Sequence, residues 1–140
     1  MKILEVNHLK KIYVSHLSSN QVEALSDVTF SIEQGEYAAI MGESGSGKTT
    51  LLNLLASLDR PTAGEIIVDG QNLASVSDRR LAAYRRENLG FVFQDFNLLD
   101  TFTIQDNIFL PLVLSGKKVP EMKERLEPLA KILGILDILK

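Results

Sequence analysis

Apolar positions in the first 41 residues recur with the spacing of β-strands. Residues 2–14 alternate loosely between apolar and polar side chains and are rich in β-branched residues, which predicts a strand with up to two interruptions. Residues 28–33 alternate strictly and predict a strand with one covered face. Residues 37–41 form a short continuous apolar run, which is typical of a strand buried on both faces.

The pattern then changes to the period of a helix. The leucines between residues 51 and 58 share one face of a helix that we expect over residues 48–58. Pro61 cannot continue the hydrogen-bond ladder of this helix, so the helix must end before it. Residues 65–68 predict a strand that closes on the turn dipeptide Asp69-Gly70.

Four further elements are expected in the rest of the chain. A helix is predicted over residues 78–86 and a short strand over residues 91–93. Thr103 and Asp106 have the spacing of a capping box and predict the start of a helical turn that ends near Pro111. Residues 121–140 are helical in composition, although a proline and a glycine within them are expected to bend or break the helix.

Composition and charge exclude several classes of protein. The chain has 140 residues, of which 45% are hydrophobic and 24% charged, which excludes a disordered or collagen-like protein. A formal net charge of −3 argues against a basic surface for nucleic acid, so we expect no nucleic-acid partner. With no cysteine, the chain has no disulfide and no thiolate nucleophile. Its apolar runs are shorter than the roughly 20 residues of a membrane span, so any membrane role requires a partner.

One segment carries a specific chemistry. The residues from Gly42 to Thr49, GESGSGKT, match the pattern G-x-x-x-x-G-K-[ST] in full. Small residues allow backbone N–H groups to surround a phosphate, and the start of the following helix adds its own N–H groups. Lys48 supplies a cation for the β- and γ-phosphates, and the Thr49 hydroxyl is a ligand for Mg²⁺.

We therefore predict a site for nucleotide phosphates. Its expected residues are Gly42, Glu43, Ser44, Gly45, Ser46, Gly47, Lys48, Thr49 and Thr50. The motif alone leaves open a kinase, a GTPase, a transport ATPase and a nucleotide-binding module that does not hydrolyse.

The residues around this motif resemble the N-terminal half of the nucleotide-binding domain of ABC transporters. The resemblance is carried by ALSDVTFSIEQGE at residues 24–36, LDRPTAGEI at 58–66 and LGFVFQ at 89–94. Within the family, FQDFNLLDTFT at residues 93–103 and Leu-Pro-Leu at 110–112 resemble the bacitracin-export and antimicrobial-peptide-resistance branch. The macrolide-export and lipoprotein-release ATPases are near relatives of that branch.

The resemblance implies a fold and further site residues. The fold would be the α/β fold of an ABC-type P-loop NTPase, with an N-terminal antiparallel β subdomain, the start of a helical subdomain and an incomplete core sheet. Tyr13 would be the A-loop aromatic that stacks on adenine. Gln94 would be the Q-loop glutamine, which reaches the metal or the attacking water. Lys48 and Gln94 would serve catalysis, Thr49 and Gln94 would bind the metal, and ATP and Mg²⁺ are the implied cofactors.

The resemblance also implies partners and a location. A member of this family acts with a transmembrane permease subunit and a second ATP-binding subunit, as a homodimer, at the cytoplasmic face of the cell membrane. The implied function is to couple ATP binding and hydrolysis to the export of an antimicrobial peptide or similar substrate. Residues 95–115 fall where the family docks its permease, and the apolar side chains there suit either docking or core packing. They include Phe96, Leu98, Leu99 and Phe102. The alternative is a P-loop module, kinase or GTPase of another class.

Two segments imitate motifs that the chain lacks. Asp69 follows an apolar run as in a Walker B strand, but Gly70 comes next and predicts a turn. Residues 114–116 copy the first half of the ABC signature motif, but two lysines follow. Walker B, the signature motif and the switch histidine are thus not found. We expect residues 1–140 to be the N-terminal portion of one nucleotide-binding domain, which alone binds ATP weakly or not at all and hydrolyses none.

Overall fold

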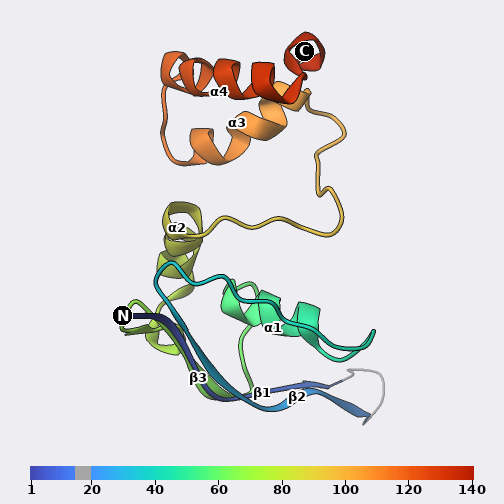
Figure 1. Ribbon diagram of the computed structural model, residues 1–140, viewed down its shortest axis with the longest axis vertical. Helices are drawn as coiled ribbons and strands as arrows, with labels where there is room; N and C mark the ends of the chain where they lie inside the picture. Colours follow the sequence, from blue (N-terminus) through green and yellow to red (C-terminus); the bar gives the residue numbers. More distant parts are fainter. Residues whose placement is uncertain (15–19) are drawn as a thin grey trace. The chain divides into compact units, whose positions relative to one another are not determined.

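The computed structural model describes residues 1–14 and 20–140, and these form two compact units. The first unit, Met1–Leu89, contains a β-sheet with helices, and the second, Gly90–Lys140, contains helices (Figure 1). Within the described residues, no helix is both long and apolar enough to span a bilayer. The antiparallel sheet of the first unit confirms the antiparallel β subdomain that is expected from the sequence.

The sheet of the first unit has four strands, and every neighbouring pair is antiparallel. They are β1 (Lys2–Val14), β2 (Gln21–Glu33), β3 (Ala63–Val68) and β4 (Gln71–Asn72), in the spatial order β2-β1-β3-β4. The prediction of β1 is confirmed, and register shifts interrupt its pairing with both neighbours. β2 starts at Gln21, well before the predicted Val28, because its polar first half pairs with the end of β1.

The turn between β3 and β4 confirms the prediction for Asp69-Gly70. Asp69 has φ 47° and Gly70 has φ 75°, so both central residues are left-handed, as a type I′ hairpin requires. Val68 and Gln71 pair on either side of the turn. Asp69 is therefore a turn residue, and the Walker B reading of this segment is excluded.

Helix α1 (Lys48–Leu55) begins where predicted and ends three residues early. The Leu58 N–H donates to the Asn53 carbonyl and the Ser57 N–H donates to the Leu54 carbonyl, which is the Schellman pattern of a helix end. Ser57 takes the left-handed conformation of that motif, with φ 56°. Because the chain turns away here, Leu58 does not join the buried face that the leucine spacing suggested and is half exposed.

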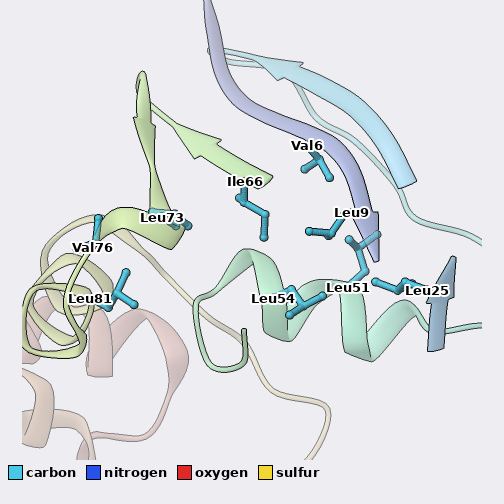
Figure 2. Close-up of a cluster of buried hydrophobic side chains, with 9 residues drawn as sticks. All are labelled: Val6, Leu9, Leu25, Leu51, Leu54, Ile66, Leu73, Val76 and Leu81. Carbon is cyan, nitrogen blue, oxygen red and sulfur yellow. The ribbon is translucent and has the colours of Figure 1, made fainter. Parts of the chain in front are cut away.

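The core of the first unit lies between α1 and the sheet. The leucines of α1 point toward side chains of β1, β2 and β3, and the core continues to helix α2 (Asp78–Asn88), whose prediction is confirmed (Figure 2). Its buried members are Val6, Leu9, Leu25, Leu51, Leu54, Ile66, Leu73, Val76 and Leu81.

Two predicted strands are wrong. Residues 37–41 and 91–93 have no strand assignment, and their side chains are exposed, with Tyr37 at 96%, Met41 at 89% and Val92 at 97%. A strand exists only where a neighbouring strand accepts and donates its backbone hydrogen bonds. Neither run has such a neighbour within the described part of the chain.

The second unit consists of α3 (Ile104–Leu114), α4 (Val119–Leu133) and a 3₁₀ turn at Leu136–Ile138. The predicted capping box is confirmed, because the Asp106 N–H donates to Thr103 Oγ1 at 3.1 Å and the Thr103 N–H donates to Asp106 Oδ2 at 3.4 Å. α3 continues past Pro111, where the sequence predicted its end.

The predicted helix over residues 121–140 is only partly confirmed. It begins at Val119, passes through Pro128 and ends at Leu133, beside Gly134. α3 and α4 pack against each other through a small apolar cluster. Its buried members are Phe109, Met122, Leu126, Ala130 and Leu139.

Candidate nucleotide-binding site

The loop from Gly42 to Gly47 leads into the N-terminus of α1 and is anchored on β2. Gly47 has φ 88°, and a Cβ at this residue would lie 2.4 Å from the Ala24 carbonyl oxygen and 2.9 Å from Leu25 Cδ2. Only glycine fits this close approach of loop to strand. The contact fixes the end of the loop to the same part of the sheet that pairs with the end of β1.

Lys48 folds back over its own loop. Its Nζ donates hydrogen bonds to the carbonyl oxygens of Gly42 at 2.8 Å and Glu43 at 2.6 Å, and lies 3.4 Å from Ser46 Oγ. The backbone carbonyl groups of the loop thus hold the ammonium group of Lys48 close to the loop. An anionic ligand bound in this loop would meet a positive charge already in position.

The loop fits a phosphate group in two further respects. A Cβ at Gly45, which has φ 80°, would meet no atom within 4 Å, so the backbone there is open to a ligand. The first N–H groups of α1 lack partners within the helix and carry the positive end of its dipole. The exposed Thr49 hydroxyl, in the same first turn, is a hard oxygen donor of the kind that Mg²⁺ takes. The residues from Gly42 to Thr50 thus lie in one loop and the first turn of α1, and their role at a nucleotide phosphate stays a prediction.

Tyr13 lies on β1, and two side chains fix its position. Its hydroxyl donates to Asp59 Oδ2 at 2.9 Å, and Lys11 Nζ lies 4.7 Å from the centroid of its ring. Lys11 also donates to Asp59 Oδ1 at 2.7 Å, so the three side chains form a closed cluster. Tyr13 itself is 41% exposed and keeps part of its ring open to solvent.

The register of the sheet brings this cluster near the phosphate loop. Lys11 pairs with Leu25 and Tyr13 pairs with Val22 across β1 and β2. Gly47 packs against Ala24 and Leu25, so the loop meets the sheet at the residues that face the cluster. In Figure 1 the Val14 end of β1 and the N-terminus of α1 lie toward the same side of the first unit.

The charge of Asp59 is stabilised inside this cluster. Burial acts to raise the pKa of its carboxyl, whereas three hydrogen bonds act to lower it. The donors are the Lys11 ammonium, the Arg60 backbone N–H and the Tyr13 hydroxyl. The hydrogen bonds prevail, and the pKa of Asp59 lies below its ordinary value.

Gln94 belongs to the second unit, in an exposed stretch between α2 and α3. The phosphate loop and Tyr13 belong to the first unit. The role of Gln94 at the metal or the attacking water therefore stays a prediction. Ser115, in the segment that imitates the signature motif, hydrogen-bonds the Pro111 carbonyl with its hydroxyl at the end of α3.

Sequence reasoning missed Lys11 and Asp59. Lys11 and Tyr13 are two residues apart on a strand, and this spacing alone places both side chains on one face of the sheet. Asp59 follows the Schellman turn of α1, and no periodic pattern indicates that this turn reaches β1. Lys11 could therefore have been predicted from the sequence, whereas Asp59 could be found only once the fold was known.

Comparison with known proteins finds similar sequences over almost the whole chain. The model of the family described as ABC transporter matches residues 25–140. The ABC transporter ATP-binding protein YvcR of Bacillus subtilis is 51% identical over 139 residues, which are 99% of this chain and 54% of YvcR. The bacitracin export ATP-binding protein BceA of Halalkalibacterium halodurans is 42% identical over 138 residues, 99% of this chain and 54% of BceA.

The fold is also found among solved structures. The ATP-binding cassette MJ0796, as a dimer in a post-hydrolysis state bound to ADP and Pi, superposes with a TM-score of 0.80 at 36% sequence identity. The match covers 87% of this chain and 53% of that cassette. The chain spans about half the length of the curated relatives it matches.

Proposed function

Because the chain belongs to the ABC transporter family and shares the P-loop NTPase fold of ATP-binding cassettes, we propose that it binds ATP as part of a transporter's ATP-binding subunit. The observation that carries this proposal is the phosphate loop, where Gly47 is packed on β2 and Lys48 is held over the backbone of residues 42 and 43. In this reading, residues 1–140 are the N-terminal portion of one nucleotide-binding domain.

The site residues take different parts of the nucleotide. Residues 42–47, together with Lys48 and Thr50, bind the phosphates through backbone N–H groups and one ammonium group. Thr49 and Gln94 would hold Mg²⁺, which would neutralise phosphate charge when bound. Tyr13 supplies an aromatic face for the base. Lys48 and Gln94 would further serve hydrolysis, Lys48 by placing positive charge at the β- and γ-phosphates.

The complete transporter would contain further subunits beside the one to which this chain belongs. We propose a second ATP-binding subunit, since MJ0796 is a dimer, and a transmembrane permease that holds the subunit at the cytoplasmic face of the membrane. The net charge of −3 gives no support to a nucleic-acid partner. The 42% identity to a bacitracin export protein favours export of an antimicrobial peptide or similar substrate.

We also propose that residues 1–140 alone bind ATP weakly or not at all and hydrolyse none. The sequence contains the phosphate loop, whereas a signature motif, a Walker B pair and a switch histidine are not found in it. An ATPase assay on the purified 140-residue chain tests this directly. Steady release of phosphate that Lys48→Ala abolishes would contradict it.

The proposal of ATP binding is tested by the nucleotide affinity of the complete ATP-binding subunit, which we call the intact protein. Lys48→Ala is expected to weaken MgATP binding by about 100-fold, because a charge-assisted contact to phosphate is lost. Lys10→Ala is the matched control, since Lys10 also lies in the first unit and pairs with Glu23 instead. GTP bound more tightly than ATP, or phosphate transfer to a small acceptor, would favour a GTPase or kinase and overturn the proposal.

A further inference from the structure

We propose that Lys11 and Asp59 are positioning residues that hold the Tyr13 ring as a one-sided platform for the base of the bound nucleotide. This inference rests on the proposed function, because it concerns the same nucleotide. Neither residue needs to touch the nucleotide. Each acts through Tyr13.

The contacts of Tyr13 restrict its ring in two ways. The hydroxyl donates to Asp59 Oδ2 at 2.9 Å, which sets the direction in which the ring points. Lys11 Nζ lies over the ring, 4.7 Å from its centroid, and covers one face. A base that stacks on Tyr13 must therefore use the opposite face.

Asp59 can fix the ring only because its own segment is fixed to β1. The Thr62 N–H donates to the Lys10 carbonyl at 2.8 Å, and the Ile12 N–H donates to Thr62 Oγ1 at 2.9 Å. Lys11 Nζ donates to the Arg60 carbonyl at 2.7 Å as well as to the Asp59 carboxylate. Four hydrogen bonds thus hold residues 59–62 along the strand that carries Tyr13.

The same segment connects the platform to the phosphate loop through α1. The N-terminus of α1 follows the loop, and its C-terminus ends in a Schellman turn that leads directly to Asp59. One short helix therefore carries the phosphate loop at one end and the anchor of the Tyr13 ring at the other. Because the ring is ordered before the base arrives, stacking costs less side-chain entropy.

The test compares two ligands that share the phosphates and differ in the base. MgATP contacts both the loop and the platform, whereas magnesium tripolyphosphate has no base and reports on the loop alone. Affinities of the intact protein for both ligands are measured by calorimetry for the wild type, Asp59→Asn and Lys11→Met. Lys10→Met is the matched control, since Lys10 is the neighbouring residue on β1 and pairs with Glu23.

Asp59→Asn and Lys11→Met are each expected to weaken MgATP binding about threefold to tenfold and to leave tripolyphosphate binding unchanged. Tyr13→Ala sets the upper limit of the effect, about tenfold or more, because stacking on the base is lost entirely. The Lys10→Met control is expected to change neither affinity. Equal weakening of both ligands by Asp59→Asn would show a structural role only and overturn the inference, as would an unchanged affinity for MgATP.

Tyr13→Phe guards against a misfolded Asp59 variant. It keeps the ring and the contact with Lys11 but removes the hydrogen bond to Asp59, so a threefold loss for MgATP alone is expected from it as well. The double variant with Tyr13→Phe and Asp59→Asn is expected to lose less binding free energy for MgATP than the sum of the losses in the two single variants. Failure of the proposed function looks different, because Lys48→Ala would then leave the affinity for both ligands unchanged.

Discussion

Two apolar segments of similar length differ in the first unit, because one forms a paired strand and the other forms none. β3 (Ala63–Val68) pairs with β1 on one side and β4 on the other, and Ile66 is 3% exposed. Residues 37–41 are at least as apolar, yet they form no strand and all five are exposed, Tyr37 and Met41 almost completely. Hydrophobicity does not separate the two segments. The presence of strand neighbours does.

The difference shows what holds this unit together. β3 gains backbone hydrogen bonds from two neighbours and covers α1 with its apolar face. The run at residues 37–41 lies next to the phosphate loop in sequence, but no strand within the described residues pairs with it. Among the residues that the structure describes, the loop is therefore anchored on β2 through Gly47, and the run that precedes the loop adds no strand pairing.

The largest test of this contrast compares Leu54 with Met41. Leu54→Ala is expected to lower the free energy of unfolding by about 3 kcal/mol, because Leu54 is 1% exposed and its removal leaves a cavity between α1 and the sheet. Met41→Ser is expected to change it by less than about 0.5 kcal/mol, since Met41 is 89% exposed. Urea denaturation followed by circular dichroism measures both values. A loss at Met41 as large as that at Leu54 would break the contrast and show that residues 37–41 are packed in the protein in solution.

A second test compares two glycines of the phosphate loop. Gly47→Ala is expected to cost about 2 to 3 kcal/mol, because the new Cβ adds a collision with the Ala24 carbonyl to the strain of a positive φ. Gly45→Ala carries the same kind of strain without a collision and is expected to cost about 1 kcal/mol. Thermal unfolding of both variants shows which of the two loses more stability. Equal losses would mean that the loop is not anchored on β2 and would weaken the contrast between its two sides.

Most of the elements could be predicted from the sequence, because their signals are local. Alternation predicted β1, capping-box spacing predicted the start of α3, and a turn dipeptide predicted the β3–β4 hairpin. The two wrong strands, at residues 37–41 and 91–93, depend on a partner, which no local pattern reveals. The early end of α1 depends on a serine in the left-handed conformation, which propensity does not anticipate.

The site divides in the same way. The phosphate loop is one continuous segment, so its residues could be predicted from spacing alone, and the structure shows them as a loop that leads into α1. The surroundings of Tyr13 depend on Asp59, which is 46 residues away and meets β1 only after folding. Gln94 is identified by resemblance, and its role stays a prediction.

The smallest expected effect concerns Asp59 and the pH dependence of the free energy of unfolding of the first unit. Since the pKa of Asp59 lies below its ordinary value of 3.8, its ionised form stabilises the fold above that value, and this contribution is lost as the pH falls through the lowered pKa. Asp59→Asn is therefore expected to cost about 1 kcal/mol or less at pH 7, and its cost is expected to shrink below pH 3.8. Glu23→Gln is the control, because the ion pair of Glu23 with Lys10 is more exposed and is expected to contribute a few tenths of a kcal/mol. Urea denaturation of the three proteins at pH 7 and at acid pH gives the comparison. A cost at Asp59 that grows on acidification would reverse the sign and contradict a carboxylate held ionised by Lys11 and Tyr13.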